Sequence, residues 1–213
     1  IAGGQESMST SPHAINIRAG KKLGKAELID TMIKDGLWDA FNGYHMGVTA
    51  ENVATKFQIT RNDQDKFALS SQTKAIKAQE QERFKEEIVN FKIKSKKNNI
   101  DFKKDEHPRK ETSMESLERL KPVFQEDGTV TAGNASGIND GAAAVLLMPS
   151  NEAEKKGLEK LATIKSWASC GVDPSLMGTG PIPSSKKALD LAGWSTKDLD
   201  LVESNEAFAA QSI

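Results

Sequence analysis

The sequence predicts an α/β fold in its second half and a loop-rich insertion in its first half. After residue 130 the composition shifts from charged to small and apolar, and short apolar runs alternate with helical segments. Such alternation is typical of βαβ units. Residues 5–47, in contrast, are rich in turn formers, serine, glycine and lysine, which favours loops lying over another part of the molecule.

The composition excludes several classes of function. The 213 residues carry 29 basic and 30 acidic side chains, so no overall field attracts nucleic acid. No apolar run approaches the roughly 18 residues of a spanning helix, and no secretory pattern opens the chain. We therefore expect no membrane or nucleic-acid partner and a cytoplasmic protein, with an organelle still open. One cysteine, Cys170, and three histidines favour neither a disulfide nor a zinc site, so we expect no metal.

Helical patterns dominate the segment that follows residue 48. A first helix is predicted from Thr49. Thr60 with Asp63 forms a capping-box pattern, which predicts a long polar helix to about Phe84. The period-two pattern of 89–93 then predicts a half-buried strand, returned through 96–99 into a hairpin.

Basic side chains gather on the hairpin and on the segment after it. A solvated face and an attractive rim for a phosphorylated ligand both remain open. The residues are Lys92, Lys94, Lys96, Lys97, Lys103, Lys104, Arg109 and Lys110.

The second half reads as alternating strands and helices. Gly157 and Gly193 are predicted to end two of the helices. In order, we expect strand 142–148, helix 150–156, strand 161–168, helix 184–192, strand 199–203 and helix 205–213.

Four features carry possible chemistry, each with a plain structural alternative. The small-residue run 130–144 allows close backbone approach to a ligand, or only tight packing. Asn205 ends a predicted strand as a helix cap, a water holder, or both. Met177 lies in a turn-rich loop that reverses the chain or lines a pocket, and His45 is a packed or surface histidine, or a site residue. Cys170 is interpreted as structural, and no nucleophile lies beside a base.

Five segments in fixed order across the chain resemble the thiolase family, and within it the short-chain acetyl-CoA acetyltransferases. They are Ala2-Gly-Gly-Gln-Glu-Ser-Met-Ser9, His45-Met-Gly-Val-Thr-Ala-Glu-Asn-Val-Ala54, Val130-Thr-Ala-Gly-Asn-Ala-Ser-Gly-Ile-Asn-Asp-Gly-Ala-Ala-Ala144, Gly171-Val-Asp-Pro174 with Met177-Gly-Thr-Gly-Pro181, and Asn205-Glu-Ala-Phe208.

The resemblance implies the layered αβαβα thiolase fold and a division of the chain. Residues 1–8 would end the N-terminal thiolase half, 9–136 would form the loop domain that binds coenzyme A, 137–149 would return to the N-terminal half, and 150–213 would begin the C-terminal half. The uncapped run at 206–213 and the start on Ile1 lead us to expect an internal piece of a larger protein.

The resemblance also implies roles for individual residues. Asn205 would hold a water of the oxyanion hole as the one catalytic residue, Met177 would form a wall of a short acyl pocket, Ser136 would bond the pantetheine, and Arg109 would contact the nucleotide end. The positions matching coenzyme A contacts are Leu37, His45, Met46, Arg109, Ser116, Phe124, Ala132, Ala135, Ser136, Ala207 and Phe208.

The implied activity is reversible Claisen condensation of two acetyl-CoA to acetoacetyl-CoA plus coenzyme A through a cysteine acyl-enzyme, with no tightly bound cofactor. The nucleophilic cysteine, the basic cysteine and the catalytic histidine match no residue here, and Cys170 matches neither cysteine. An inactive fragment that binds only coenzyme A or a partner chain is the alternative, and a carrier-dependent ketosynthase fits less well.

The resemblance also implies an oligomeric state. The stretch 15–29 matches a loop that joins dimers into tetramers in the family, and its lysines suit a hydrated contact.

Overall fold

The computed structural model describes residues 1–94 and 99–213. Lys96, Lys97 and all of the predicted turn 96–99 except Asn99 lie outside the described residues. The described chain divides into two compact units. Unit 1 comprises Ile1–Val53 and Ile138–Asn205, and unit 2 comprises Ala54–Gly137 and Glu206–Ile213. No described helix is both long and apolar enough to cross a membrane.

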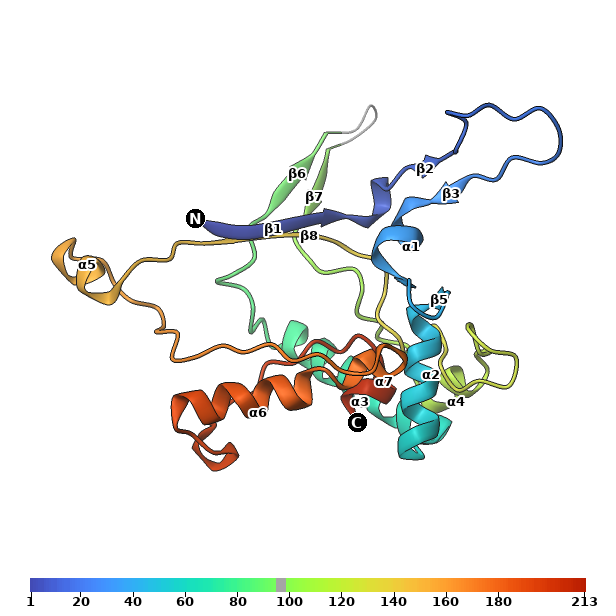
Figure 1. Ribbon diagram of the computed structural model, residues 1–213. Helices are drawn as coiled ribbons and strands as arrows, with labels where there is room; N and C mark the ends of the chain where they lie inside the picture. Colours follow the sequence, from blue (N-terminus) through green and yellow to red (C-terminus); the bar gives the residue numbers. More distant parts are fainter. Residues whose placement is uncertain (95–98) are drawn as a thin grey trace. The chain divides into compact units, whose positions relative to one another are not determined.

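An antiparallel ribbon is the longest strand pairing of unit 1 (Figure 1). β1 (Ala2–Ser7) pairs with β8 (Asp140–Val145) in the register Ala2 with Val145 and Ser7 with Asp140. A Cβ on Gly3 would lie 2.3 Å from the carbonyl oxygen of Ala143, so the strands approach closely only because this residue is glycine. The small-residue composition therefore serves close packing at this ribbon.

The end of this ribbon is fastened by a carboxylate. Asp140 accepts hydrogen bonds from the Ser9 main-chain N–H at 2.9 Å and from the Ser9 hydroxyl at 2.5 Å. These bonds hold the pKa of Asp140 below its ordinary value, because they favour the charged carboxylate.

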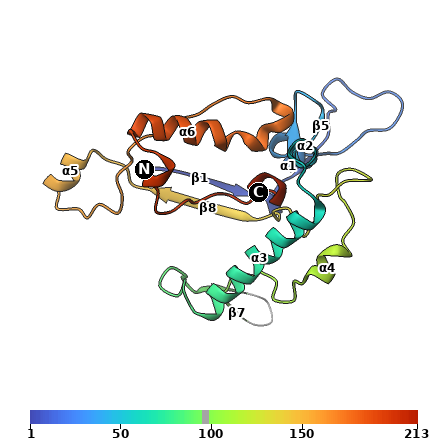
Figure 2. The same cartoon turned by 90° about the horizontal axis from the view of Figure 1, so that it is seen from below.

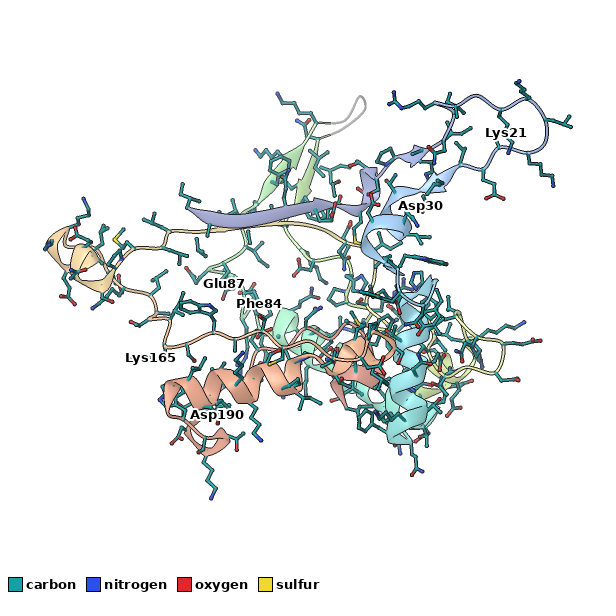
Figure 3. The ribbon with its side chains drawn as sticks, in the orientation of Figure 1. Lys21, Asp30, Phe84, Glu87, Lys165 and Asp190 are labelled. Atoms are coloured by element: carbon teal, nitrogen blue, oxygen red, sulfur yellow. The ribbon has the colours of Figure 1, made fainter. Side chains whose placement is uncertain are left out.

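Short elements fill residues 13–45. β2 (His13–Ala14) pairs with β3 (Ile29–Asp30), and the stretch between them, which includes Lys21, is exposed (Figure 3). Asp30 caps α1 (Thr31–Gly36) by accepting from the main-chain N–H groups of Met32 and Ile33. β4 (Trp38–Asp39) and β5 (Tyr44–His45) form a small hairpin.

Both glycine-terminated helices of unit 1 are confirmed. α5 (Ser150–Lys155) is followed by Gly157 at φ +62°, and α6 (Pro181–Ala192) ends at Gly193 at φ +70°, the left-handed conformation that glycine adopts at low cost. α6 begins three residues before the predicted start because prolines are tolerated in a first helical turn, where the N–H is unbonded anyway.

Two predicted strands of unit 1 do not form. Segments 161–168 and 199–203 contain no strand residues, and large apolar side chains there, such as Trp167 at 81% and Leu201 at 91%, are exposed. A strand exists only where a neighbouring strand completes its hydrogen-bond ladder. The described sheets are all two-stranded and antiparallel, so the expected parallel βαβ pairing is absent from the described chain.

α2 (Met46–Phe57) begins three residues before the predicted Thr49, whose hydroxyl bonds the Met46 carbonyl oxygen at 2.6 Å. α3 (Arg61–Glu80) starts with the predicted capping box of Thr60 and Asp63. It ends four residues before the predicted Phe84, and Glu82 takes a positive φ of 52° in the turns that follow.

Unit 2 is organised along α3. α4 (Met114–Glu118) and α7 (Ala209–Ser212) both contact this helix, and Figure 2 shows α3 and α4 together. Leu117, Val130 and Ala210 are among its buried apolar residues. β6 (Phe91–Ile93) and β7 (Ile100–Phe102) form the predicted hairpin, with Phe91 opposite Phe102, although both strands are exposed on both faces rather than half buried.

Candidate functional site

The predicted site residues fall into two groups, one in each unit. Unit 1 holds Leu37, His45, Met46, Met177 and Asn205. Unit 2 holds the larger group, which is Arg109, Ser116, Phe124, Ala132, Ala135, Ser136, Ala207 and Phe208.

The core of the unit 2 group is a tight turn in the small-residue run. The Thr131 main-chain N–H donates to Asn134 Oδ1 at 2.8 Å, and the Asn134 N–H donates to the Thr131 carbonyl oxygen at 3.2 Å. A Cβ on Gly133 would lie 2.5 Å from Leu117 Cδ2 and 2.6 Å from Leu120 Cδ1. The turn therefore packs tightly, as the plain alternative for this run predicts, and it also presents Ala132 and Ser136 at the surface.

This turn pairs with the segment that leads into α7. The Ser136 N–H donates to the Ala207 carbonyl oxygen at 2.9 Å, and the Ala209 N–H donates to the Asn134 carbonyl oxygen at 2.9 Å. Ala135 and Phe208 form an antiparallel bridge between these two bonds. Four predicted site residues are thus brought together by main-chain hydrogen bonds.

An aromatic contact adds a fifth predicted residue to this cluster. The rings of Phe124 and Phe208 meet edge to face, with centroids 6.3 Å apart and planes at 82°. Such pairs are favourable because the positive ring edge meets the negative ring face. Together, Phe124, Ala135, Ser136, Ala207 and Phe208 form what we call the paired-loop cluster.

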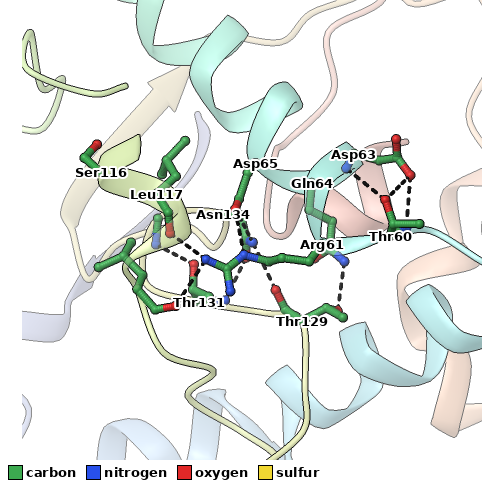
Figure 4. Close-up of polar contacts among 12 residues, drawn as sticks. Thr60, Arg61, Asp63, Gln64, Asp65, Ser116, Leu117, Thr129, Thr131 and Asn134 are labelled. Carbon is green, nitrogen blue, oxygen red and sulfur yellow. Dashed lines mark hydrogen bonds and ion pairs between the residues drawn. The ribbon is translucent and has the colours of Figure 1, made fainter. Parts of the chain in front are cut away.

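Figure 4 shows a buried polar network that reaches the small-residue turn at Asn134, the residue before Ala135 of the paired-loop cluster. We define it as Arg61, Gln64, Asp65, Thr129 and Asn134. Asp65 and Gln64 are fully buried, and Asn134 is 3% exposed. Sequence reasoning missed this network, although the four-residue spacing of an arginine and an aspartate on one helix was a usable signal.

The hydrogen bonds given for Ser116 and Arg109 go to residues outside the paired-loop cluster. The Ser116 hydroxyl closes a capping box with Ser113, accepting from its N–H at 2.9 Å and donating to its carbonyl oxygen at 2.8 Å. Arg109 is exposed, and its main-chain N–H donates to Gln72 Oε1 at 2.8 Å. The sequence did not predict that Ser116 takes part in the capping box of α4.

Arg109 borders a cavity of about 260 Å³ against the second half of α3. Lys110 Nζ lies 2.7 Å from Glu80 there, which lowers the pKa of the Glu80 carboxyl and raises that of the Lys110 ammonium. The lining residues are Gln72, Thr73, Ile76, Lys77, Glu80, Arg109, Lys110 and Thr112.

In unit 1, His45 and Met46 adjoin the start of α2. The Met46 N–H donates to the Leu37 carbonyl oxygen at 2.8 Å, so three predicted residues are neighbours. His45 Nδ1 accepts from the Gly47 N–H at 2.9 Å, and burial lowers the pKa of the imidazole. Because Nδ1 accepts this hydrogen bond, the neutral imidazole carries its proton on Nε2.

Met177 is carried by a 3-10 helix, Pro174–Thr179, and is 41% exposed. Asn52 Nδ2 donates to the Ser175 carbonyl oxygen at 3.0 Å and fastens this loop to α2. Met177 is thereby tied, through α2, to the segment that carries His45.

Asn205 is exposed and lies outside any helix. α7 begins at Ala209, and Phe208, not Asn205, occupies its N-cap position without a side-chain cap bond. The interpretation of Asn205 as a helix cap is therefore wrong. Among residues 1–94 and 99–213, no group of three histidine, cysteine, aspartate or glutamate side chains is arranged to hold a metal ion.

Two protein-family models match the chain: "Thiolase, N-terminal domain" matches residues 1–151, and "Thiolase, C-terminal domain" matches residues 158–213. Acetyl-CoA acetyltransferases from Rhizobium meliloti and Paracoccus denitrificans are 58% and 60% identical to it over 212 and 213 residues. These alignments cover 100% of this chain and 54% of each relative, so the chain spans about half their length.

Solved structures confirm the predicted α/β thiolase fold. The Bacillus anthracis acetyl-CoA acetyltransferase superimposes with a TM-score of 0.92 at 47% identity, over 98% of this chain and 53% of that chain. The human mitochondrial 3-ketoacyl-CoA thiolase superimposes with a TM-score of 0.92 at 45% identity, over 99% and 53%.

Proposed function

The chain belongs to the thiolase family, and on this premise we propose that the protein carrying it is an acetyl-CoA C-acetyltransferase. In the condensation, the bond from the acetyl carbonyl carbon to sulfur breaks in one acetyl-CoA, and a carbon–carbon bond forms to the methyl carbon of another. The methyl proton ends on the released coenzyme A thiol, and the other product is acetoacetyl-CoA. Thiolysis is the reverse reaction.

The observation that carries this proposal is the pairing of Ala135 and Ser136 with Ala207 and Phe208. It gathers residues that the family resemblance assigns to coenzyme A. Alanines leave room beside the backbone for a thin, extended ligand arm, while Phe124 and Phe208 offer apolar ring surface. The relatives named acetyl-CoA acetyltransferase support the same ligand.

In this proposal each residue has a distinct task. Ser136 hydrogen-bonds the pantetheine amides, Arg109 contacts the nucleotide end, and Met177 limits the acyl pocket to short chains. Asn205 orients a water toward the thioester carbonyl, whose oxygen gains negative charge as the nucleophile adds. Leu37, His45, Met46, Ser116 and Ala132 complete the ligand contacts. No tightly bound cofactor is required.

The domain division is part of the proposal. Residues 9–136 form the coenzyme A loop domain, 1–8 and 137–149 belong to the N-terminal half, and 150–213 to the C-terminal half. Pairing of β1 with β8 supports the return of the chain to one ribbon on either side of the loop domain.

We also propose a cytoplasmic homo-oligomer, a tetramer tied through the stretch 15–29. Lys21, Lys22 and Lys25 are exposed there, which suits a hydrated contact. Cell fractionation tests the location. The molar mass measured by light scattering tests the oligomeric state. If the variant with all three lysines replaced by glutamate remains a tetramer, the proposal that the stretch 15–29 holds the tetramer together is contradicted.

The activity is tested with the full-length protein by following acetoacetyl-CoA loss on addition of coenzyme A. We expect thiolysis to acetyl-CoA and, in the opposite direction, acetoacetyl-CoA from acetyl-CoA alone. Acetoacetyl-carrier protein serves as the matched substrate control, because it presents the same acyl group on a different carrier. Turnover of the carrier-bound substrate only, or of neither substrate, contradicts the proposal.

A further inference from the structure

We propose that Asp65 is a positioning residue for the coenzyme A thioester, because with Arg61 it fixes Asn134 and thereby the pairing that shapes the paired-loop cluster. The inference rests on the proposed function, since coenzyme A is the ligand it concerns. All the residues of this chain of contacts lie in unit 2.

Both oxygens of the Asp65 carboxylate are used. Oδ2 accepts from Arg61 Nε at 2.7 Å, and Oδ1 accepts from Asn134 Nδ2 at 3.0 Å. Arg61 also donates to the carbonyl oxygens of Leu117 and Leu120. A fully buried carboxylate is costly unless it is paired and hydrogen-bonded, and here both oxygens of Asp65 have a donor.

The orientation of Asn134 follows from that carboxylate. A carboxylate only accepts, so the nitrogen of the Asn134 amide must face Asp65. Asn134 Nδ2 also donates to the Thr129 carbonyl oxygen at 3.1 Å, and its Oδ1 accepts from the Thr131 N–H at 2.8 Å. These three bonds fix the side chain at both ends.

The main chain of Asn134 then sets the position of the residues proposed to bind coenzyme A. Its carbonyl oxygen accepts from the Ala209 N–H, and the next residues are Ala135, bridged to Phe208, and Ser136, bonded to Ala207. A rotation at Asn134 therefore displaces both sides of the cluster. Since errors of about 1 Å in a site are costly, loss of Asp65 should weaken ligand binding without touching the ligand.

The test uses the full-length protein and its thiolysis reaction. In Asp65→Ala and Asn134→Ala we expect the KM for coenzyme A and its Kd, measured by titration calorimetry, to rise roughly tenfold, with kcat within about threefold of the unmodified protein. The double variant should raise KM no further than the larger single change, because both residues act along one path.

Thr60→Ala is the matched control. It removes the cap of α3 one residue before Arg61, so it destabilises the same helix without altering the buried polar network. We expect a lower melting temperature with an unchanged KM. Asp65→Asn conserves volume but satisfies only one of the two donors, so it supplies a second variant with the same expected rise in KM.

Any one of these results overturns the inference: an unchanged KM in folded Asp65 variants, additive effects of Asp65→Ala and Asn134→Ala, or an equal rise in KM for Thr60→Ala. Failure of both Asp65 variants to fold also overturns it, since the residue would then serve the fold alone. Failure of the proposed function is distinguishable, because the unmodified protein would then neither bind coenzyme A nor cleave acetoacetyl-CoA.

Discussion

The Ser136 main-chain N–H donates to the carbonyl oxygen of Ala207 across 2.9 Å, joining the small-residue turn to the segment before α7. The bond leaves the exposed hydroxyl of Ser136 outside this main-chain pairing. The geometry thus separates the two parts of the residue: the backbone joins the two segments, and the side chain is exposed, where we propose that it meets coenzyme A.

Ser136→Ala should weaken coenzyme A binding about threefold to tenfold, the effect of losing one hydrogen bond, with the fold unchanged because the N–H is retained. Titration calorimetry measures the affinity. Ser136→Pro is the informative companion, since it removes the N–H instead and should lower stability as well. A normal affinity in Ser136→Ala would remove the hydroxyl from the ligand contacts.

Asn205→Ala should reduce kcat for thiolysis by about 10² to 10³ with a nearly unchanged Kd for coenzyme A, the range found for a lost oxyanion-hole donor. The reason is that the developing charge exists only in the transition state. Steady-state kinetics and calorimetry check the two halves of the prediction. Unchanged turnover would exclude Asn205 from catalysis.

Gly3→Ala should destabilise the protein by about 1–3 kcal/mol, because its Cβ would lie 2.3 Å from the Ala143 carbonyl oxygen, a backbone atom that cannot rotate away. Gly4→Ala is the matched control, since nothing lies within 4 Å of a Cβ at that position. Urea unfolding compares them. Equal midpoints for the two variants would show that β1 and β8 separate freely.

Lowering the pH should destabilise the fold through His45. Burial lowers its pKa in the folded protein below the ordinary 6.5, so the unfolded chain binds the proton more readily. Stability is therefore full above pH 6.5 and is lost as the pH falls through the lowered value, where protonation also removes the Nδ1 acceptor for Gly47. Urea midpoints between pH 7.5 and 5 measure the loss.

His45→Gln should flatten that pH dependence, whereas His107→Gln, at an exposed position, should retain it. If the pH dependence of stability persists in His45→Gln and disappears in His107→Gln, the prediction that it comes from His45 is contradicted.

Local signals predicted the elements that depend on neighbours in sequence. The capping box of Thr60 and Asp63 is visible as a four-residue pattern, and Gly157 and Gly193 mark helix ends because only glycine adopts a left-handed conformation there at low cost. The strands expected at 161–168 and 199–203 failed for the converse reason, since apolar composition supplies no partner strand.

For the candidate site, the sequence by itself determined the fold family and the residue types, through motifs in a fixed order and the small residues that permit close approach. The tertiary structure alone decided that Ser136 meets Ala207, that Asn205 caps no helix, and that Asp65 holds Asn134. The physical reason is that such contacts join positions far apart in the chain, and only packing decides which distant donors and acceptors meet.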